Sequence, residues 1–385
     1  MPTAHSQSGM RPLVLISSLQ RRGAERVTVS LLTRLREQGY TVPLCTLTNR
    51  HDGPLAAEIE ARGVERLDLG SRRLADLAAL LRLIGLLRRR RIDVVHAHGQ
   101  DACILGATAC AIEGLSLIVT RHVMEEPTES LRLASRAYLA LQALQRADLV
   151  VAVSNAVAQR LAQSARLRRP PEVILNGVEP AFFDAASQPD QRQAFRNTLG
   201  LRDGPVILSV ATLGTGKGHD NLLNAAASLR DRFPHLSVLL AGEGQLEHEL
   251  RQKAMRLGDT VHLLGHREDI PQLLAAADLV CQASESEALP TALMEAAAAG
   301  RPVVATRVGG TAEVVDDQET GLLVPPGNSA ALTSAIETLL TDTQRATEMG
   351  RTAARVARKR FSLDAYVEAT LDVWLRVAGA ERIAA

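Results

Sequence analysis

Short apolar runs that alternate with helical segments are the feature of this sequence that most constrains its fold. The first run, residues 13–16, is continuous and uncharged, as expected for a strand buried on both faces of a sheet. A loop, a helix-like segment over 24–38 and a second strand-like run over 41–47 follow. The alternation continues, with further expected strands at 93–96, 117–120, 149–153 and 173–175. Strands and helices that alternate at these lengths predict a parallel sheet with helices on both faces.

The alternation is interrupted between residues 176 and 205. Asn176-Gly177 is a strong turn signal, and the polar segment 179–203 contains Pro180 and Pro189. Afterwards the pattern restarts, with expected strands at 206–210, 237–241, 261–264, 279–282, 303–305 and 322–324, and one amphipathic helix over 363–377. We therefore expect two α/β, doubly wound, Rossmann-like domains, 1–180 and 181–362, followed by a C-terminal segment 363–385. Ligands of such sheets bind beyond the carboxyl ends of the strands, so we expect the ligand in a cleft between two facing domains.

The composition excludes several classes of protein. The chain is 46% hydrophobic and 23% charged, which is typical of a folded protein with buried cores. Aromatic residues make up only 2%, too few for a protein that stacks single-stranded bases, so no nucleic-acid partner is expected. The four cysteines form no CxxC pair and no zinc-like spacing, which favours buried thiols and no metal site. No signal-peptide core and no apolar stretch long enough to span a bilayer is visible, so a cytoplasmic location is expected.

Charge is divided unevenly along the chain. Residues 1–180 contain 24 Lys and Arg against 17 Asp and Glu, whereas the remainder contains 20 against 26. A basic half favours an anionic partner or membrane surface, with ordinary surface variation as an equal alternative. Residues 80–91 combine leucines with four consecutive arginines, which could rest peripherally on the inner face of an anionic membrane. The plainer interpretation is a Rossmann helix with a solvated basic end.

A glycine-rich loop follows the expected strand at 206–210 and leads into a helix. It holds Thr212, Gly214, Gly216 and Lys217. Glycines let the backbone approach an anion, the helix N-terminus supplies N–H groups, and the lysine adds a positive charge, so the loop is a candidate diphosphate site. A P-loop is excluded by Ala211 and Gly218, and a dinucleotide fingerprint by His219. A tight turn with a surface lysine is the alternative.

Two glutamates eight residues apart, Glu287 and Glu295, follow the expected strand at 279–282. Pro290 suits the first turn of a helix, which places Glu287 in the loop before that helix and Glu295 within it. Carboxylates bind sugar hydroxyls well because each accepts several hydrogen bonds. The N–H groups around Ala288 and Leu289 would face an anion. Solvated surface charges are the alternative.

Two positions in the first half are further candidates. His122 follows a strand-like run, where its side chain would point toward the expected ligand, although a structural histidine is the alternative. Gly23 precedes a helix start and could meet a phosphate or the acceptor.

Taken together, these motifs resemble the retaining glycosyltransferases of family four, which have the GT-B fold. The E-x7-E element of that family matches Glu287 to Glu295, and its Lys-Gly loop matches Lys217-Gly218. Three further segments occur in the expected order, at 153–155 with 174–178, at 264–267 and at 309–313. The resemblance covers nearly the whole chain. It implies that the C-terminal helix crosses back and packs on the first domain.

The resemblance also implies an activity and roles for residues. The enzyme would move a sugar from a UDP- or GDP-sugar to an acceptor hydroxyl with retained configuration, in the synthesis of a cell-envelope glycan, polysaccharide or glycolipid, and without a metal. Glu287 would bind the donor sugar near the reacting carbon, Lys217 would neutralise the leaving diphosphate, and His122 would contact the donor sugar. Glu295 would hold the ribose hydroxyls. The rest of the donor site would comprise Gly23, Thr212, Gly214, Gly216, Gly265, His266, Arg267, Ala288, Leu289, Pro290 and Thr291.

One position departs from the family pattern. The family has an arginine five residues before the loop lysine, where this chain has Thr212. Loss of a charge-assisted contact to a developing anion raises the barrier substantially. Compensating cations are Arg267, Arg307 or the pair Arg21 and Arg22. A weakly active or inactive sugar-nucleotide-binding protein is therefore an alternative, as is a GT-B epimerase or phosphorylase.

Overall fold

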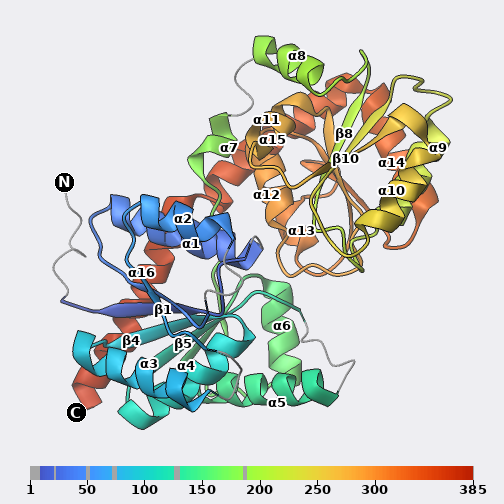
Figure 1. Ribbon diagram of the computed structural model, residues 1–385. Helices are drawn as coiled ribbons and strands as arrows, with labels where there is room; N and C mark the ends of the chain where they lie inside the picture. Colours follow the sequence, from blue (N-terminus) through green and yellow to red (C-terminus); the bar gives the residue numbers. More distant parts are fainter. Residues whose placement is uncertain are drawn as a thin grey trace. The chain divides into compact units, whose positions relative to one another are not determined.

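The chain folds into two compact units, each built on one parallel sheet (Figure 1). The computed structural model describes residues 9–20, 23–48, 53–71, 76–124, 131–184 and 189–384. Unit 1 comprises Met1–Gly177 and Leu363–Ala385, and unit 2 comprises Val178–Ser362. The units divide three residues before the expected boundary at 180. The predicted fold class, two α/β Rossmann-like domains, is confirmed.

Unit 1 contains a seven-stranded parallel sheet in the order β3-β2-β1-β4-β5-β6-β7. Its strands are β1 Pro12–Ile16, β2 Leu44–Thr46, β3 Arg66–Asp68, β4 Val94–His98, β5 Ser116–Arg121, β6 Leu149–Ala152 and β7 Glu172–Val173. The sequence pattern did not predict β3. This strand lies at the sheet edge and is half exposed, so it lacks the continuous apolar run that marks a buried strand.

Helices cover both faces of this sheet. They are α1 Gly23–Glu37, α2 Pro54–Ala61, α3 Leu77–Arg90, α4 Gln100–Glu113, α5 Leu131–Arg146, α6 Asn155–Ser164 and α16 Leu363–Ala384. In Figure 1, α1, α2 and α16 lie on one side of the sheet and α3, α4 and α5 on the other. Alternate residues of β1 show the same division: Val14 packs in the cluster with α1, whereas Leu15 lies against Gly106 of α4.

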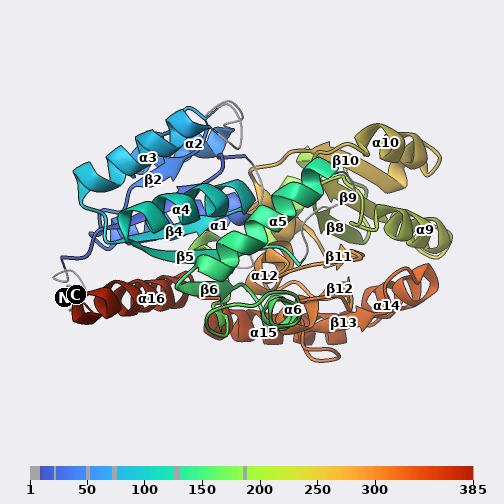
Figure 2. The same ribbon diagram turned by 90° about the horizontal axis from the view of Figure 1, so that it is seen from below.

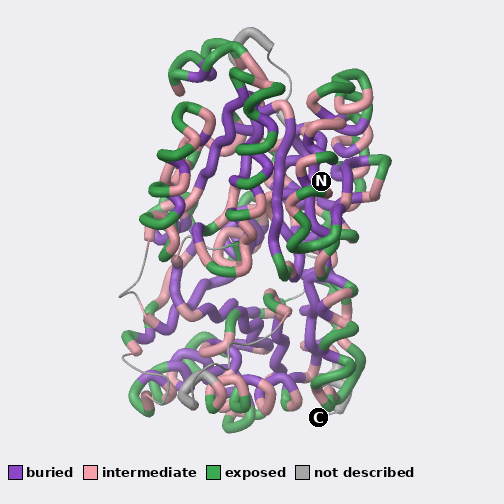
Figure 3. Tube along the Cα trace, turned by 90° about the vertical axis from the view of Figure 1, so that its right-hand side faces the viewer, coloured by how far each residue is buried: buried purple, intermediate pink, exposed green. Residues whose placement is uncertain are grey.

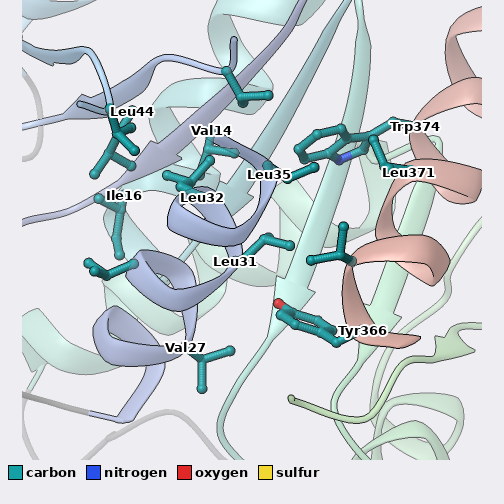
Figure 4. Packing of buried hydrophobic residues seen from close by; sticks show 14 of the residues in the cluster. Val14, Ile16, Val27, Leu31, Leu32, Leu35, Leu44, Tyr366, Leu371 and Trp374 are labelled. Carbon is teal, nitrogen blue, oxygen red and sulfur yellow. The ribbon is translucent and has the colours of Figure 1, made fainter. Parts of the chain in front are cut away.

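The C-terminal helix α16 completes the core of unit 1. Tyr366, Leu371 and Trp374 of α16 belong to the same buried cluster as Leu31 and Leu35 of α1 (Figure 4). The helix is buried as far as Val377, the expected end, and its backbone continues beyond it to Ala384.

The chain leaves and re-enters unit 1 at adjacent positions. A Cβ atom on Gly177 would lie 2.7 Å from the Cα atom of Leu363, so only glycine allows this approach. The next residue, Val178, donates its N–H to the carbonyl oxygen of Phe361 at 2.9 Å. The structure has no turn at 176–177, where the sequence predicted one; Gly177 instead allows the backbone to pack against the start of α16.

Unit 2 contains a six-stranded parallel sheet in the order β10-β9-β8-β11-β12-β13, which Figure 2 shows from one side to the other. Its strands are β8 Val206–Val210, β9 Ser237–Ala241, β10 Val261–Gly265, β11 Leu279–Gln282, β12 Val303–Thr306 and β13 Gly321–Val324. The strand order reverses direction between β8 and β11. In open α/β sheets, ligands bind beyond the carboxyl ends of the strands at such a switch point.

The helices of unit 2 also form two layers. They are α7 Pro180–Asp184, α8 Pro189–Thr198, α9 His219–Leu229, α10 Glu247–Met255, α11 Ile270–Ala276, α12 Thr291–Ala298, α13 Thr311–Val314, α14 Ser329–Thr341 and α15 Thr343–Arg360. The cluster on one face draws on α9, α10 and α14. The polar segment 179–203, where the alternation is interrupted and no helix was predicted, contains α7 and α8. Figure 3 shows that buried residues follow the strands and the inner sides of the helices in both units.

Three further observations concern the described residues only. All four cysteines are buried, and none of them forms a disulfide, as expected. Within the described ranges, no group of three or more His, Cys, Asp or Glu side chains is placed to hold a metal ion. None of the helices that the structure describes combines the length and apolar character needed to cross a membrane.

Candidate functional site

The loops that follow β8 and β11 touch backbone to backbone at the switch point of unit 2. Gly218 has a φ of +64°, and a Cβ atom there would lie 1.9 Å from the carbonyl oxygen of Ala283. The N–H of Glu285 donates to the carbonyl oxygen of Gly216 at 2.8 Å. Glycine at 218 is therefore required both by its left-handed conformation and by the close approach. This contact fixes the loop of Lys217 against the loop of Glu287.

The loop after β12 holds the backbone of Glu287 from the other side. Gly309 has a φ of +45°, and a Cβ atom there would lie 1.9 Å from the carbonyl oxygen of Glu287. That same oxygen accepts the N–H of Gly310 at 3.0 Å. The hydroxyl of Thr306 donates to the carbonyl oxygen of Ser284 at 2.5 Å. Both glycines belong to the segment 309–313 that contributed to the family resemblance.

Three donors converge on one carboxylate oxygen, Oε1 of Glu287. The ammonium of Lys217 lies 2.7 Å from it, the amide of Gln282 2.6 Å and the hydroxyl of Ser284 2.7 Å. The side chain of Glu287 is only 11% exposed, so these donors replace most of its hydration. Lys217 and Glu287 are 70 residues apart in sequence and meet because β8 and β11 are neighbours. Gln282 and Ser284 were not predicted, although both lie within five residues of Glu287.

The helix after this loop lies as the sequence predicted, with one small difference. Pro290 precedes α12 as its N-terminal cap residue instead of standing in its first turn, and Thr291 is the first helical residue. Ala288, Leu289 and Pro290 are buried. Glu287 lies in the loop, and Glu295 lies in the second turn of α12, partly buried.

The glycine-rich loop at 211–218 is tied together through Thr212. Its carbonyl oxygen accepts the N–H of Gly214 at 2.8 Å and Nε2 of His219 at 3.1 Å. Because Nε2 donates in this contact, the hydrogen bond from the ring of His219 holds the start of α9 against the loop. The side chain of Thr212 itself is exposed, and Gly216 has a φ of +76°.

The loop after β9 supports the same region and was missed from sequence. A Cβ atom on Gly242 would lie 1.9 Å from the carbonyl oxygen of Ala211, and the N–H of Leu213 donates to the carbonyl oxygen of Glu243 at 2.9 Å. Gly242 also donates its N–H to the carbonyl oxygen of Gly265, at the end of β10, at 2.8 Å. A glycine directly after a predicted strand was the available signal. His266 follows Gly265 in this loop and is partly buried.

The arginines considered as substitutes for the missing family arginine are engaged elsewhere where the structure describes them. Arg267 forms a two-point contact with Asp269, at 2.8 and 2.5 Å, and these hydrogen bonds raise the pKa of its guanidinium. Arg307 lies 2.5 Å from Asp317. The pair at 21 and 22 lies outside the described residues. Each of the two described arginines is therefore paired with an aspartate in this conformation.

In unit 1, His122 directly follows β5 and contacts a second histidine. Its Nε2 lies 3.0 Å from Nδ1 of His98, the last residue of the neighbouring strand β4. His96, two residues earlier, accepts the indole N–H of Trp374 at 2.9 Å and lies 2.6 Å from the hydroxyl of Thr120. His96 and His98 were not predicted, although two histidines at alternate positions of a strand end were a visible signal. Gly23, the other candidate in unit 1, is the exposed first residue of α1.

Burial keeps these three histidines uncharged. It lowers the pKa of His96 to about 3 and that of His98 well below its ordinary value, with a further lowering from neighbouring histidines. Burial, and then Arg121, lower the pKa of His122 as well. Each ring therefore has one N–H and one bare nitrogen at neutral pH.

Comparison with known proteins places the chain in a family. Residues 191–356 match the model for glycosyl transferases group 1, and residues 21–182 match the model for glycosyltransferase family 4. A D-inositol 3-phosphate glycosyltransferase of Salinispora arenicola is 31% identical, over 94% of this chain and 86% of its own length. The chain belongs to the group 1 glycosyltransferases. The family predicted from the motifs is thus confirmed.

Other relatives share parts of the chain. A GDP-mannose-dependent mannosyltransferase of Mycolicibacterium smegmatis, which acts on a phosphatidylinositol monomannoside, is 34% identical over 57% of this chain, and the match spans little more than half of that relative's length, 58%. Among solved structures, Anabaena HepE in complex with UDP-glucose superposes with a TM-score of 0.84, at 27% identity over 95% of this chain and 99% of HepE. The lipopolysaccharide glycosyltransferase WaaG shares the fold, with a TM-score of 0.76 at 17% identity over 94% of this chain and 99% of its own. These likenesses confirm the GT-B type of fold.

Proposed function

We propose that this glycosyltransferase moves a sugar from a nucleoside diphosphate sugar to an acceptor hydroxyl with retention of the anomeric configuration. The observation that carries the proposal is the contact between Lys217 and Glu287 at the switch point of unit 2. Glycosyl transfer from such a donor builds negative charge on the departing diphosphate and positive charge on the sugar. A lysine and a glutamate fixed at one place can serve these opposite needs.

The geometry suggests how the two residues divide the work. Oε1 of Glu287 receives three donors, and these leave Oε2 as the oxygen for a sugar hydroxyl. Lys217 is partly exposed at 27%, and its flexible stem lets the ammonium move from Glu287 toward the diphosphate. Glu295 would hold the ribose hydroxyls, and His122 would contact the donor sugar. The charge on the leaving group is assigned to Lys217, so the proposed reaction needs no metal.

The relatives support a choice of first substrates. HepE is described in complex with UDP-glucose, and the Mycolicibacterium relative is named as GDP-mannose-dependent. We therefore place UDP-hexoses first and GDP-hexoses second among donors. A sugar, polysaccharide or lipid-linked sugar is the proposed acceptor, in envelope glycan, polysaccharide or glycolipid synthesis.

The test is a transfer assay with matched variants. The protein is incubated with UDP-glucose or GDP-mannose and a panel of sugar acceptors, and the anomeric configuration of the product is read by NMR. Glu287→Ala should lose transfer, whereas Glu285→Ala, an exposed glutamate of the same loop, should keep it. Equal turnover by the wild type and Glu287→Ala would contradict the proposal, as would a product of inverted configuration.

Added arms separate the alternatives. Incubation with the donor alone reveals an epimerase, and incubation of a glycoside with inorganic phosphate reveals a phosphorylase. Binding of UDP without turnover across the panel would favour the inactive alternative that Thr212 raises. Activity that survives a chelator would agree with the metal-free reaction.

We further propose that the enzyme works in the cytoplasm and contacts the inner face of an anionic membrane peripherally through a surface of α3. Leu77 and Leu81, one helical turn apart, are 67% and 60% exposed. The helix ends in consecutive arginines, although Arg88 pairs with Glu113 and Arg90 with Glu65. Co-sedimentation with phosphatidylglycerol vesicles should be lost in the double variant L77S/L81S. It should persist in M255S, a substitution at an exposed residue of unit 2. Neutral phosphatidylcholine vesicles should bind neither the wild type nor M255S.

A further inference from the structure

Two histidines meet at the carboxyl edge of the sheet in unit 1. His98 ends β4, and His122 follows β5, the strand beside it. Their rings stack with centroids 5.3 Å apart and planes 29° apart, and Nδ1 of His98 lies 3.0 Å from Nε2 of His122. The contact therefore uses one nitrogen of each ring and leaves Nε2 of His98 and Nδ1 of His122.

The two remaining nitrogens lie in different surroundings. His98 is fully buried, and its Nε2 has no hydrogen-bond partner among the residues that the structure describes. His122 is partly exposed, so its ring can meet a ligand. Since both rings are neutral, one N–H lies in the shared contact, and the tautomers follow from which ring supplies it.

The buried nitrogen of His98 decides between the two arrangements. If His122 donated from Nε2, the proton of His98 would sit on its own Nε2, as a buried N–H without a partner. Such a group costs about 1–3 kcal/mol, and orphaned buried N–H groups are rare. If His98 donates from Nδ1, its Nε2 is a bare acceptor, which is better tolerated than a buried N–H without a partner. His122 then carries its proton on Nδ1.

The ring of His98 is held in this position by its neighbours. The ring of His96 lies against it, with centroids 4.3 Å apart. His96 is itself fixed, because its Nδ1 accepts the indole N–H of Trp374 and its Nε2 must then donate to Thr120. The C-terminal helix thus supports the histidine pair through the core.

We propose that His98 is a positioning residue that fixes His122 in the Nδ1–H tautomer, so that His122 offers the ligand a hydrogen-bond donor and not a proton acceptor. That the ligand atom is an oxygen of the donor sugar rests on the proposed function, whereas the tautomer does not. With its Nε2 occupied by His98, His122 cannot take a proton from the acceptor hydroxyl. Its task is to bind and orient.

The tautomer is tested without any substrate. Long-range 1H–15N correlation spectra of the 15N-histidine-labelled full chain at neutral pH show which ring nitrogen carries the proton, with His122→Gln and His98→Gln used for assignment. The expected result is protonated Nδ1 and bare Nε2 in His122. A protonated Nε2 in His122, or a charged ring, would overturn the inference whatever the activity of the protein.

Kinetics test the role of the pair once a donor has been found. His98→Phe keeps the ring stack but removes the donor to His122, and it should lower kcat about tenfold with the acceptor KM unchanged. His122→Asn keeps an N–H donor and should retain far more activity than His122→Ala. If His122 were a general base, Asn and Ala would both lose about 100-fold or more, and that result would refute a donor role. A wild type inactive with every donor would count against the proposed function, while the spectra would still decide the tautomer.

Discussion

Replacing His96 by leucine should destabilise unit 1 by about 2 kcal/mol. His96 is buried, accepts the indole N–H of Trp374 at 2.9 Å and donates to Thr120 at 2.6 Å. Leucine fills the space but leaves the indole N–H unpartnered, which costs about 1–3 kcal/mol, and removes the bond to Thr120, worth about 1 kcal/mol. The gain from burying apolar atoms in place of a desolvated ring offsets about 1 kcal/mol. The net value corresponds to roughly a 30-fold change in the unfolding equilibrium.

The stability assay uses the fluorescence of a single tryptophan. Trp374 is its only tryptophan, so the emission of that residue during urea unfolding reports on unit 1. The midpoint should fall in His96→Leu while the denaturant slope stays the same. His96→Gln, whose amide can both accept from the indole and donate to Thr120, should recover at least half of the loss. A His96→Leu variant within about 0.5 kcal/mol of the wild type would refute the reasoning, because that is the usual scatter of neutral substitutions.

Three further predictions follow from particular contacts. Burial lowers the folded pKa of His96 to about 3 and that of His98 well below 6.5, so the unfolded chain binds protons first as the pH falls. The free energy of unfolding of unit 1 should therefore fall by about 1.4 kcal/mol per pH unit per histidine below pH 6.5. Urea titrations at pH 7.5 and 5.5 should show a smaller loss in His96→Gln. Gly218→Ala should abolish transfer and lower the melting temperature, because its Cβ would meet a carbonyl oxygen at 1.9 Å. Gly258→Ala, at a position with φ of +58° and open space, should lower only the melting temperature, and by less. Similar losses of stability in the two variants would contradict the close approach at Gly218. Thr212→Arg adds the cation that the family places there and should lower the donor KM about three- to tenfold in a UDP-glucose titration, while an unchanged or higher KM would show that this loop does not face the diphosphate.

The secondary structure was predictable where burial dictates the pattern. Strands covered on both faces need continuous apolar residues, so β1 and β8 were visible as short uncharged runs. The edge strand β3 and the helices α7 and α8 were missed. The strand is partly exposed, and each helix begins with a proline in a polar segment, so solvent relaxes the pattern that burial would impose.

The candidate site was predictable in part. Lys217 stood out because a strand, a glycine-rich loop and a helix occur in sequence, and Glu287 because the spacing to Glu295 matches a family element. The residues that surround them did not stand out. Gln282 and Ser284 are ordinary polar residues in the sequence, and only the fold shows that both donate to the same oxygen of Glu287.

The sequence by itself determined the parallel sheets, the two units and the family, because these depend on local patterns of apolar residues, glycines and spaced motifs. Only the tertiary structure decided which side chains meet. Lys217 reaches Glu287 across 70 residues because β8 pairs with β11, and His98 reaches His122 because β4 pairs with β5. Strand order is set by the packing of whole helices and sheets, so it is absent from any local window of sequence. The contact of His98 with His122, and the tautomer that it imposes, could therefore be derived only from the folded chain.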